Sequence, residues 1–166
     1  MRYVLALVLL VCVPSAGLAQ DAAGQPAADE RTAVLAAVQN FFDTMASADV
    51  AAGRAGSIPE GRFFSVREST SGGPPSIRSF TNEESYNRMA SDKRRLRERM
   101  WNPEVRVHGP IAVVWTPYDF WVDGKFSHCG VDAFNLVKTP DGWKMAGGLY
   151  TVEQTGCAPS PLGPLK

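Results

Sequence analysis

The chain has 166 residues, of which 45% are hydrophobic, and it carries 17 basic and 17 acidic side chains. This length suits one domain and is short for two. Because the formal net charge is zero, the protein has no overall field that attracts nucleic acid, and we expect no nucleic-acid partner.

The first nineteen residues predict a secretory signal peptide. A basic start, Met1-Arg2, precedes an apolar run over residues 3–13, and the small residues Gly17 and Ala19 precede a cleavage site. The run is shorter than the roughly 20 apolar residues of a membrane-spanning helix. We therefore expect cleavage after Ala19, a periplasmic or secreted location, and no membrane association of the mature chain.

Composition divides the rest of the chain. Residues 20–28 form a linker of small residues, residues 29–157 form the domain, and the Pro-rich residues 158–166 are expected to be a disordered tail. Two cysteines remain after signal removal, Cys129 and Cys157. An oxidising compartment favours a disulfide between them, and the alternative is two independent thiols.

The domain begins with helical patterns. Asp29 is expected to cap a helix running to about Ser47, and Asp49 a short second helix ending near Gly53 or Gly56. The apolar stripe of the first helix contains Val34, Leu35, Val38, Phe41, Phe42 and Met45. A strand is expected around residues 63–66, and a loop at 71–76.

A third helix is expected to follow a capping box, Thr81 with Glu84, and to continue to about Met100. Its apolar stripe would contain Tyr86, Met89, Leu96 and Met100. The basic run at residues 92–100 would then form a solvated helix face.

The second half of the domain predicts strands at about 103–108, 111–122, 125–138 and 143–153. Turn signals at Asp123-Gly124 and at residues 140–142 separate the last three strands. Helices followed by an antiparallel meander indicate an α+β domain.

A two-residue turn at Asp123-Gly124 fixes an expected register. It places Asp119 opposite His128, Trp115 opposite Asp132, and Trp121 opposite Phe126, all on one face. Phe134 and Leu136 would share that face, and the other face would carry Val114, Tyr118, Phe120, Cys129, Val131, Ala133 and Val137. A bulge would exchange the faces. Since both faces are apolar and helices cover only one, we expect a homodimer.

Two segments resemble the nuclear transport factor 2-like superfamily, which includes ketosteroid isomerase and SnoaL-like proteins. They are the start AVQNFFDTMASADVAAGRA and the region from Ala112 through Tyr118, Phe120 and Gly124 to the run HCGVDAF at 128–134. They are similar to an exported bacterial branch near a family described as lumazine-binding. The resemblance implies a cone-shaped α+β barrel, with N-terminal helices packed on a curved, mainly antiparallel sheet around a pocket.

Three polar residues are candidates for chemistry. Asp119 beside His128 would orient the imidazole as a general base, and Asp132 in aromatic surroundings would be a general acid. The alternatives are a self-satisfied polar pair and a structural hydrogen bond. We expect no metal site, because the only other histidine is His108 and no short ligand motif occurs.

The expected ligand-binding residues are Trp115, Trp121, Phe134, Tyr86 and, from the resemblance, Tyr118. The sequence thus favours an exported domain that binds a small apolar or aromatic molecule without a cofactor. One alternative is an acid–base enzyme, a dehydratase, isomerase or cyclase, that uses His128 and Asp132. Another is a dimerisation or scaffold domain.

Overall fold

The computed structural model describes residues 27–69 and 72–165. The expected signal peptide and most of the linker lie outside the described residues. The elements in chain order are α1 (Ala28–Ser47), α2 (Val50–Ala55), β1 (Ser57–Arg67), β2 (Ser76–Thr81), α3 (Asn82–Met89), β3 (Leu96–Met100), β4 (Glu104–His108), β5 (Ile111–Val122), β6 (Lys125–Thr139) and β7 (Gly142–Thr151).

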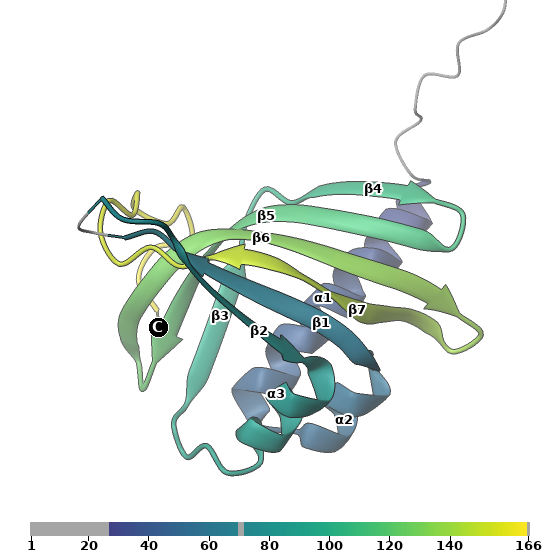
Figure 1. Ribbon diagram of the computed structural model, residues 1–166. Coiled ribbons are helices and arrows are strands. Elements are labelled where there is room, and N and C mark those ends of the chain that lie inside the picture. Colours follow the sequence, from purple (N-terminus) through teal and green to yellow (C-terminus); the bar gives the residue numbers. More distant parts are fainter. Residues whose placement is uncertain (1–26, 70–71, 166) are drawn as a thin grey trace, which may run out of the picture.

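The strands form one sheet in the order β2-β1-β7-β6-β5-β3, with β4 also paired to β5. Every pairing is antiparallel except β1 with β7. The long strands curve over α1, while α2 and α3 lie together at one end of the sheet (Figure 1). The expected α+β cone, with N-terminal helices on a curved and mainly antiparallel sheet, is confirmed.

The core lies between α1 and the concave face of the sheet. Val34, Val38 and Phe42, spaced four residues apart on α1, are almost fully buried and share one apolar cluster with Phe134 and Leu136 of β6. This spacing places the three side chains on one helix face. The α1 stripe predicted from the sequence is therefore the side of the helix that packs on the sheet.

Local signals define the helix starts. The Asp49 carboxylate accepts the Ala52 amide at 3.0 Å and caps α2. Thr81 and Glu84 form the predicted capping box at the start of α3. The first helix begins at Ala28 without a side-chain cap, so the capping role expected for Asp29 is wrong.

The third helix is shorter than the sequence predicts, since it was expected to continue to about Met100. α3 ends at Met89, and the basic run that follows forms a turn and β3, which pairs with the edge of β5. Two carboxylates take the backbone amides that a longer helix would use. Asp92 accepts a hydrogen bond from the Arg94 amide and Asp123 accepts one from the Arg95 amide, both at 3.0 Å. Tyr86 and Leu96 are therefore not on one helix face. A further strand that the sequence does not predict, β2, pairs with β1 at the sheet edge.

The β5–β6 turn has the predicted form. Asp123 and Gly124 both have positive φ, 52° and 77°, as a two-residue type I′ turn requires. Val122 pairs with Lys125, and the next pair also follows the expected register.

Beyond that turn the register shifts by one residue. Ser127 is an extra residue on β6, so His128 lies opposite Phe120 and Asp132 opposite Thr116. Such a bulge reverses which side chains of one strand share a face with those of its partner. The predicted partners of His128 and Asp132 are therefore wrong.

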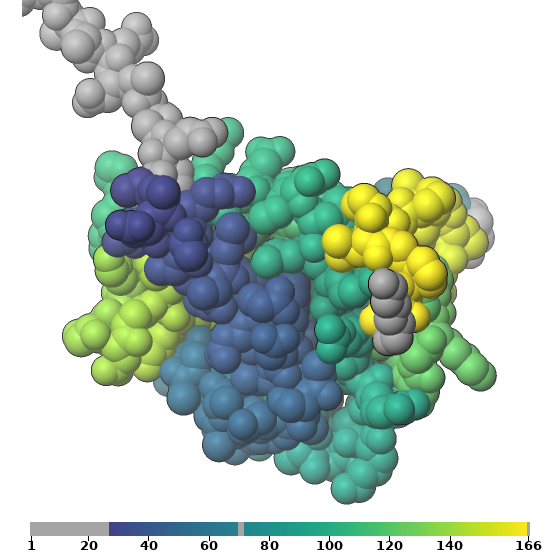
Figure 2. All heavy atoms as spheres, turned by 180° about the vertical axis from the view of Figure 1, so that it is seen from behind, coloured from purple at the N-terminus to yellow at the C-terminus, as the bar shows by residue number. Residues whose placement is uncertain are grey.

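The C-terminal segment follows a defined path along the convex side of the sheet. Cys129 and Cys157 form a disulfide, and Arg99 donates to the Gly163 carbonyl at 2.8 Å. Figure 2 shows this segment as part of the molecular surface. Residues 158–165 are thus not the loose tail expected from their composition. None of the helices in the described part of the chain could cross a bilayer.

We predict that Leu136→Ala lowers the free energy of unfolding by about 2–5 kcal/mol, because it leaves a cavity in the core. Leu162→Ala is the matched control, since Leu162 is 48% exposed and Leu136 only 1%. Urea unfolding measures both variants. Equal losses for the two leucines would contradict the assigned core.

Candidate functional site

A cavity of about 180 Å³ lies between the helices and the concave face of the sheet. Most of its wall is aromatic, and Met45 and Ser85 also line it. The aromatic side chains are Phe41, Phe63, Phe80, Tyr118, Phe120, Phe134 and Tyr150. Two carboxyl groups and one imidazole reach the same space, those of Glu98, Asp132 and His128. A mainly apolar hollow with few polar groups is typical of a small-molecule site.

Strand alternation brings these groups together. After the bulge, His128 and Asp132 lie on the concave face of β6, opposite Phe120 and Thr116 of β5, while Glu98 of β3 lies across from Phe120. His128 and Asp132 are four residues apart, or roughly 13 Å along the strand. They therefore act at different parts of the cavity and do not form a dyad.

The carboxyl groups of Glu98 and Asp132 lie within hydrogen-bonding reach of each other. Asp132 is 2% exposed, and its Oδ2 has no hydrogen-bond donor among the described residues. Two ionised carboxylates can only accept hydrogen bonds, so a contact between them requires a proton. A shared proton supplies the missing donor and removes one of two buried negative charges.

The electrostatics of the pair agree with this geometry. Burial raises the pKa of Glu98 to about 8, while its hydrogen bond to Asp132 opposes the shift. Burial also raises the pKa of Asp132, helped by the charge and hydrogen bond of Glu98. Near neutral pH the pair therefore keeps at least one proton and can donate it to a ligand.

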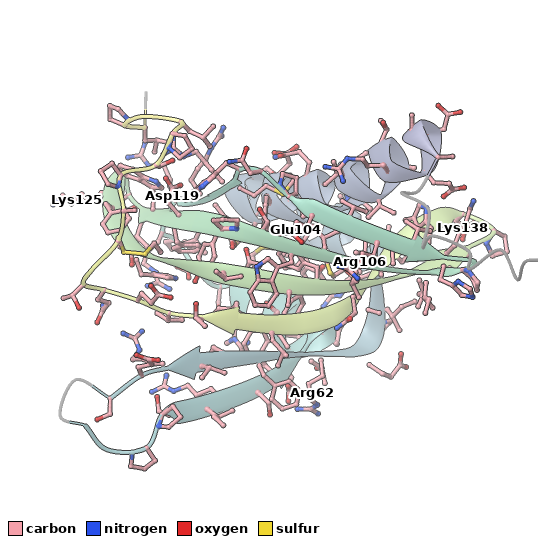
Figure 3. All side chains as sticks on the ribbon, turned by 90° about the horizontal axis from the view of Figure 1, so that it is seen from above. Arg62, Glu104, Arg106, Asp119, Lys125 and Lys138 are labelled. Atoms are coloured by element: carbon pink, nitrogen blue, oxygen red, sulfur yellow. A yellow bond between two sulfur atoms is a disulfide. The ribbon has the colours of Figure 1, made fainter. Side chains whose placement is uncertain are left out.

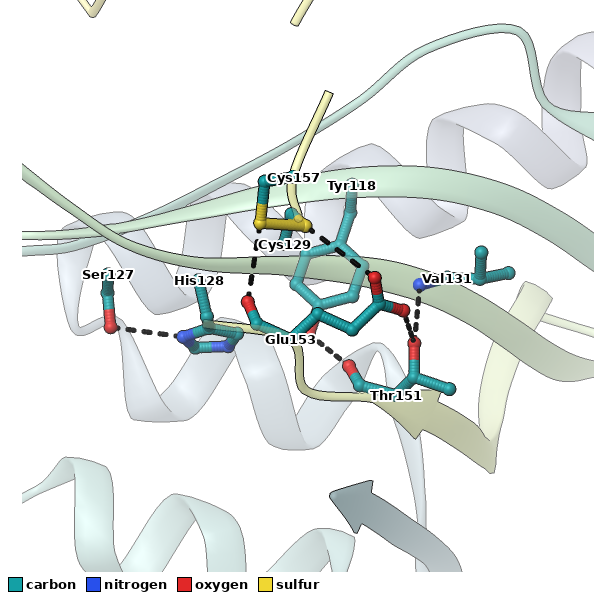
Figure 4. Close-up of a disulfide and its surroundings, with 8 residues drawn as sticks. All are labelled: Tyr118, Ser127, His128, Cys129, Val131, Thr151, Glu153 and Cys157. Carbon is teal, nitrogen blue, oxygen red and sulfur yellow. Dashed lines mark hydrogen bonds between the residues drawn. A yellow bond between two sulfur atoms is a disulfide. The ribbon is translucent and has the colours of Figure 1, made fainter. Parts of the chain in front are cut away.

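His128 is a neutral imidazole in this setting. Burial lowers its pKa to about 4, and the positive charge of Arg67 adds to the shift. Its ring stacks on Phe120 with centroids 4.8 Å apart, and its Nδ1 is 3.0 Å from the Ser127 hydroxyl (Figure 4). The bulge residue Ser127 thus helps to fix the ring orientation.

Tyr118 lies across Gly130, its cross-strand partner. A Cβ at Gly130 would lie 2.9 Å from the Tyr118 ring and 2.4 Å from the Thr151 carbonyl oxygen, so only glycine fits there. The Tyr118 hydroxyl donates to that carbonyl at 2.6 Å (Figure 4). Burial raises the pKa of Tyr118, which makes the residue a fixed wall and not an acid.

Asp119, expected beside His128, faces the convex side of the sheet. Its carboxylate accepts two hydrogen bonds from Arg99, at 2.9 Å and 2.6 Å, and is 2% exposed. Figure 3 labels Asp119 at the end of the sheet that the C-terminal segment crosses. The bulge explains this placement, and Asp119 is a structural ion-pair partner.

Three other expected ligand contacts also lie outside the cavity. Trp115 is 56% exposed on the convex face. Trp121 packs near Phe126 on the convex side, in a hollow bordered by the C-terminal segment. Tyr86 is buried, and its hydroxyl lies 2.6 Å from that of Ser57. Of the five predicted aromatic contacts, Tyr118 and Phe134 line the cavity.

Glu98 is the site residue that sequence reasoning missed. The sequence predicts that Glu98 lies on the solvated, basic face of a helix, where a glutamate gives no sign of a binding site. The alternation of Leu96, Glu98 and Met100 with Arg97 and Arg99 is the signal that could have placed it on a strand. Within the described ranges, no three His, Cys, Asp or Glu side chains are grouped to hold a metal ion.

No protein-family model matches this sequence, and no curated protein matches it either. Solved structures do. An NTF2-like (nuclear transport factor 2-like) protein from Cytophaga hutchinsonii is 16% identical with a TM-score of 0.62, over 74% of this chain and 98% of that one. A protein of unknown function with a cystatin-like fold from Nostoc punctiforme is 13% identical with a TM-score of 0.61, over 82% and 97%.

A candidate dehydratase of the nuclear transport factor 2-like family from Streptomyces avermitilis is also similar. It is 19% identical with a TM-score of 0.56, over 75% of this chain and 95% of that one. These similarities show that the chain has the nuclear transport factor 2-like fold, as the resemblance implied. At such identities they show the fold alone.

We predict that the carboxyl pair makes the protein less stable as the pH rises from 6.5 to about 8. The folded state holds a proton that an unfolded glutamate, with a pKa of 4.5, releases, so the contribution is full below 4.5 and disappears as pH rises through about 8. Each proton that the folded pair holds and the unfolded chain releases contributes at most about 1.4 kcal/mol per pH unit to the slope. The lowered pKa of His128 acts in the opposite sense, but only between about 4 and 6.5.

Urea unfolding across this range measures the slope. The double variant Glu98→Gln/Asp132→Asn should flatten it, and Glu104→Gln, at an exposed position on β4, should preserve it (Figure 3). A slope that survives in the double variant would show that the pair holds no proton.

Proposed function

We propose that this chain is an exported domain that binds a small apolar or aromatic molecule in its cavity. The observation that carries the proposal is the mainly aromatic space of about 180 Å³ with a polar pair, Glu98 and Asp132, in its wall. Aromatic walls favour a planar apolar ligand through burial and ring packing. The protonated pair offers such a ligand one donor and one acceptor.

Export is supported by two features that are independent of the cavity. The basic and apolar start of the chain has the pattern of a secretory signal. The Cys129–Cys157 disulfide suits an oxidising compartment. We therefore propose a periplasmic or secreted location.

The convex face of the sheet supports a homodimer. Trp115, Ala133, Leu149 and Phe64 are successive cross-strand neighbours on β5, β6, β7 and β1. Trp115 is 56% exposed, Leu149 52% and Phe64 36%. A continuous apolar row of this kind marks an interaction surface, and we propose that a second copy covers it. In that case dimerisation would accompany ligand binding, and a scaffold role would use the same surface.

The second candidate function is an acid–base enzyme of the dehydratase, isomerase or cyclase type. The shared proton favours it, because the pair could protonate a leaving group while neutral His128 accepts a proton elsewhere on the ligand. This proposal assigns the acid to Asp132 with Glu98 and gives no role to Asp119. It needs no cofactor.

Binding of naphthamide, a neutral aromatic amide, tests the proposed function through the quenching of its fluorescence. We expect Ser85→Phe to weaken binding by about tenfold, roughly 1.4 kcal/mol, because the new ring fills the cavity. Ser91→Phe, in the exposed turn after α3, is the control and should bind as the wild type does. A thermal unfolding curve for each variant verifies that it is folded.

Undiminished binding by a folded Ser85→Phe variant would contradict the proposed site. So would the absence of any binding to the wild-type chain. Native mass spectrometry of protein isolated from its own periplasm would complement the titration, since a retained small molecule would identify the ligand.

A further inference from the structure

A second and larger hollow adjoins the cavity. It has a volume of about 780 Å³, and Phe80, His128 and Tyr150 line both spaces. We call this hollow the vestibule. Because these three side chains line both spaces, the cavity and the vestibule lie next to each other, and a ligand that occupies both would pass between these side chains.

Three arginines from three different elements line the vestibule, Arg67 of β1, Arg78 of β2 and Arg88 of α3. In the antiparallel β1–β2 pair, Arg67 lies opposite Ser76, and Ser65 lies opposite Arg78. All four residues therefore share one face, with the two arginines at diagonal positions. Arg88 approaches from the helix and stacks on the Phe80 ring, 4.6 Å from its centroid.

None of these arginines has a carboxylate partner in the described part of the chain. The ion pairs there involve Arg54, Arg94 and Arg99 but not Arg67, Arg78 or Arg88. No aspartate or glutamate lines the vestibule, whereas serines 65, 76 and 79 do. The positive charge of Arg88 helps to lower the pKa of Glu84. The Glu84 carboxylate, however, accepts a hydrogen bond from the Thr81 amide and forms no ion pair with Arg88 in the described part of the chain.

Three uncompensated cations around one hollow repel each other and attract an anion. Guanidinium groups match the planar oxygens of a carboxylate and the oxygens of sulfate or phosphate. The cavity has the opposite character, because two buried carboxyl groups line it and any charge that they carry is negative. An anionic group is therefore favoured in the vestibule and disfavoured beside Asp132.

We propose that the natural ligand is an aromatic acid, with its ring in the cavity and its anionic group held in the vestibule by Arg67, Arg78 and Arg88. This inference rests on the proposed function and adds the charge and orientation of the ligand. The hydroxyls of Ser65 and Ser76, on the same face as Arg67 and Arg78, supply further hydrogen-bond donors to the anion. The inference concerns a small molecule, because a ligand whose ring is enclosed cannot be the surface of a macromolecule.

The binding of naphthoate and naphthamide tests the proposed anion site, because the two molecules share one ring system and differ in charge. We expect the mature chain to bind naphthoate about tenfold more tightly at low salt, and this preference to shrink as salt screens the arginines. Arg67→Gln/Arg78→Gln should weaken naphthoate binding by about tenfold and change naphthamide binding by less than about twofold. Arg106→Gln on β4 removes the same charge outside the vestibule and should leave both affinities unchanged (Figure 3).

The outcomes separate the two proposals. Equal affinity for the two probes, or a naphthoate preference that survives in the double arginine variant, would overturn the anion site while leaving cavity binding intact. If neither probe binds, both proposals fall. If Arg106→Gln weakens naphthoate binding as much as the double variant does, the preference arises from overall charge, and the vestibule is again overturned.

Discussion

One extra residue, Ser127, decides which side chains face the cavity. The hairpin begins in the register that its Asp-Gly turn dictates, and the bulge then offsets β6 against β5 by one position. Tyr118, His128 and Asp132 consequently face α1 together, while Asp119 faces the C-terminal segment. In a two-sided sheet a shift of one residue exchanges the faces of every later pair. The polar content of the cavity, and hence the function proposed for it, depends on this offset.

Different charged groups lie on the two faces of the sheet. On the concave side, Glu98 and Asp132 share a proton within aromatic walls, and the arginine-lined vestibule lies next to them. On the convex side, the Arg99–Asp119 ion pair and the Cys129–Cys157 disulfide attach the C-terminal segment to the sheet. The groups proposed for ligand binding therefore lie on one face, while the attached C-terminal segment and the exposed apolar row lie on the other. This division explains how both faces can be apolar in sequence and still have different roles.

Features that depend on local chemistry could be predicted from the sequence. They include the cap at Asp49, the Thr81 capping box, the Asp123-Gly124 turn and the four strands of the meander. Features that depend on residues distant in the sequence could not be predicted in this way. β3 forms because the edge of β5 is available to pair with it, and its sequence also suits a helix. Glu98 was missed for that reason. The bulge at Ser127 has no sequence signal, so Tyr118 could be placed in the cavity only from the family resemblance.

We infer that Glu98 and Asp132 together hold at least one proton near neutral pH, and the proposed chemistry of the cavity depends on it. A carboxyl NMR titration of protein labelled in its aspartate and glutamate side chains measures this directly. We expect Glu98 to titrate with a midpoint near 8, Asp132 to titrate well above its ordinary range, and the two signals to move together because the sites are coupled. Two independent midpoints at ordinary carboxyl values, both below about 5, would contradict the account.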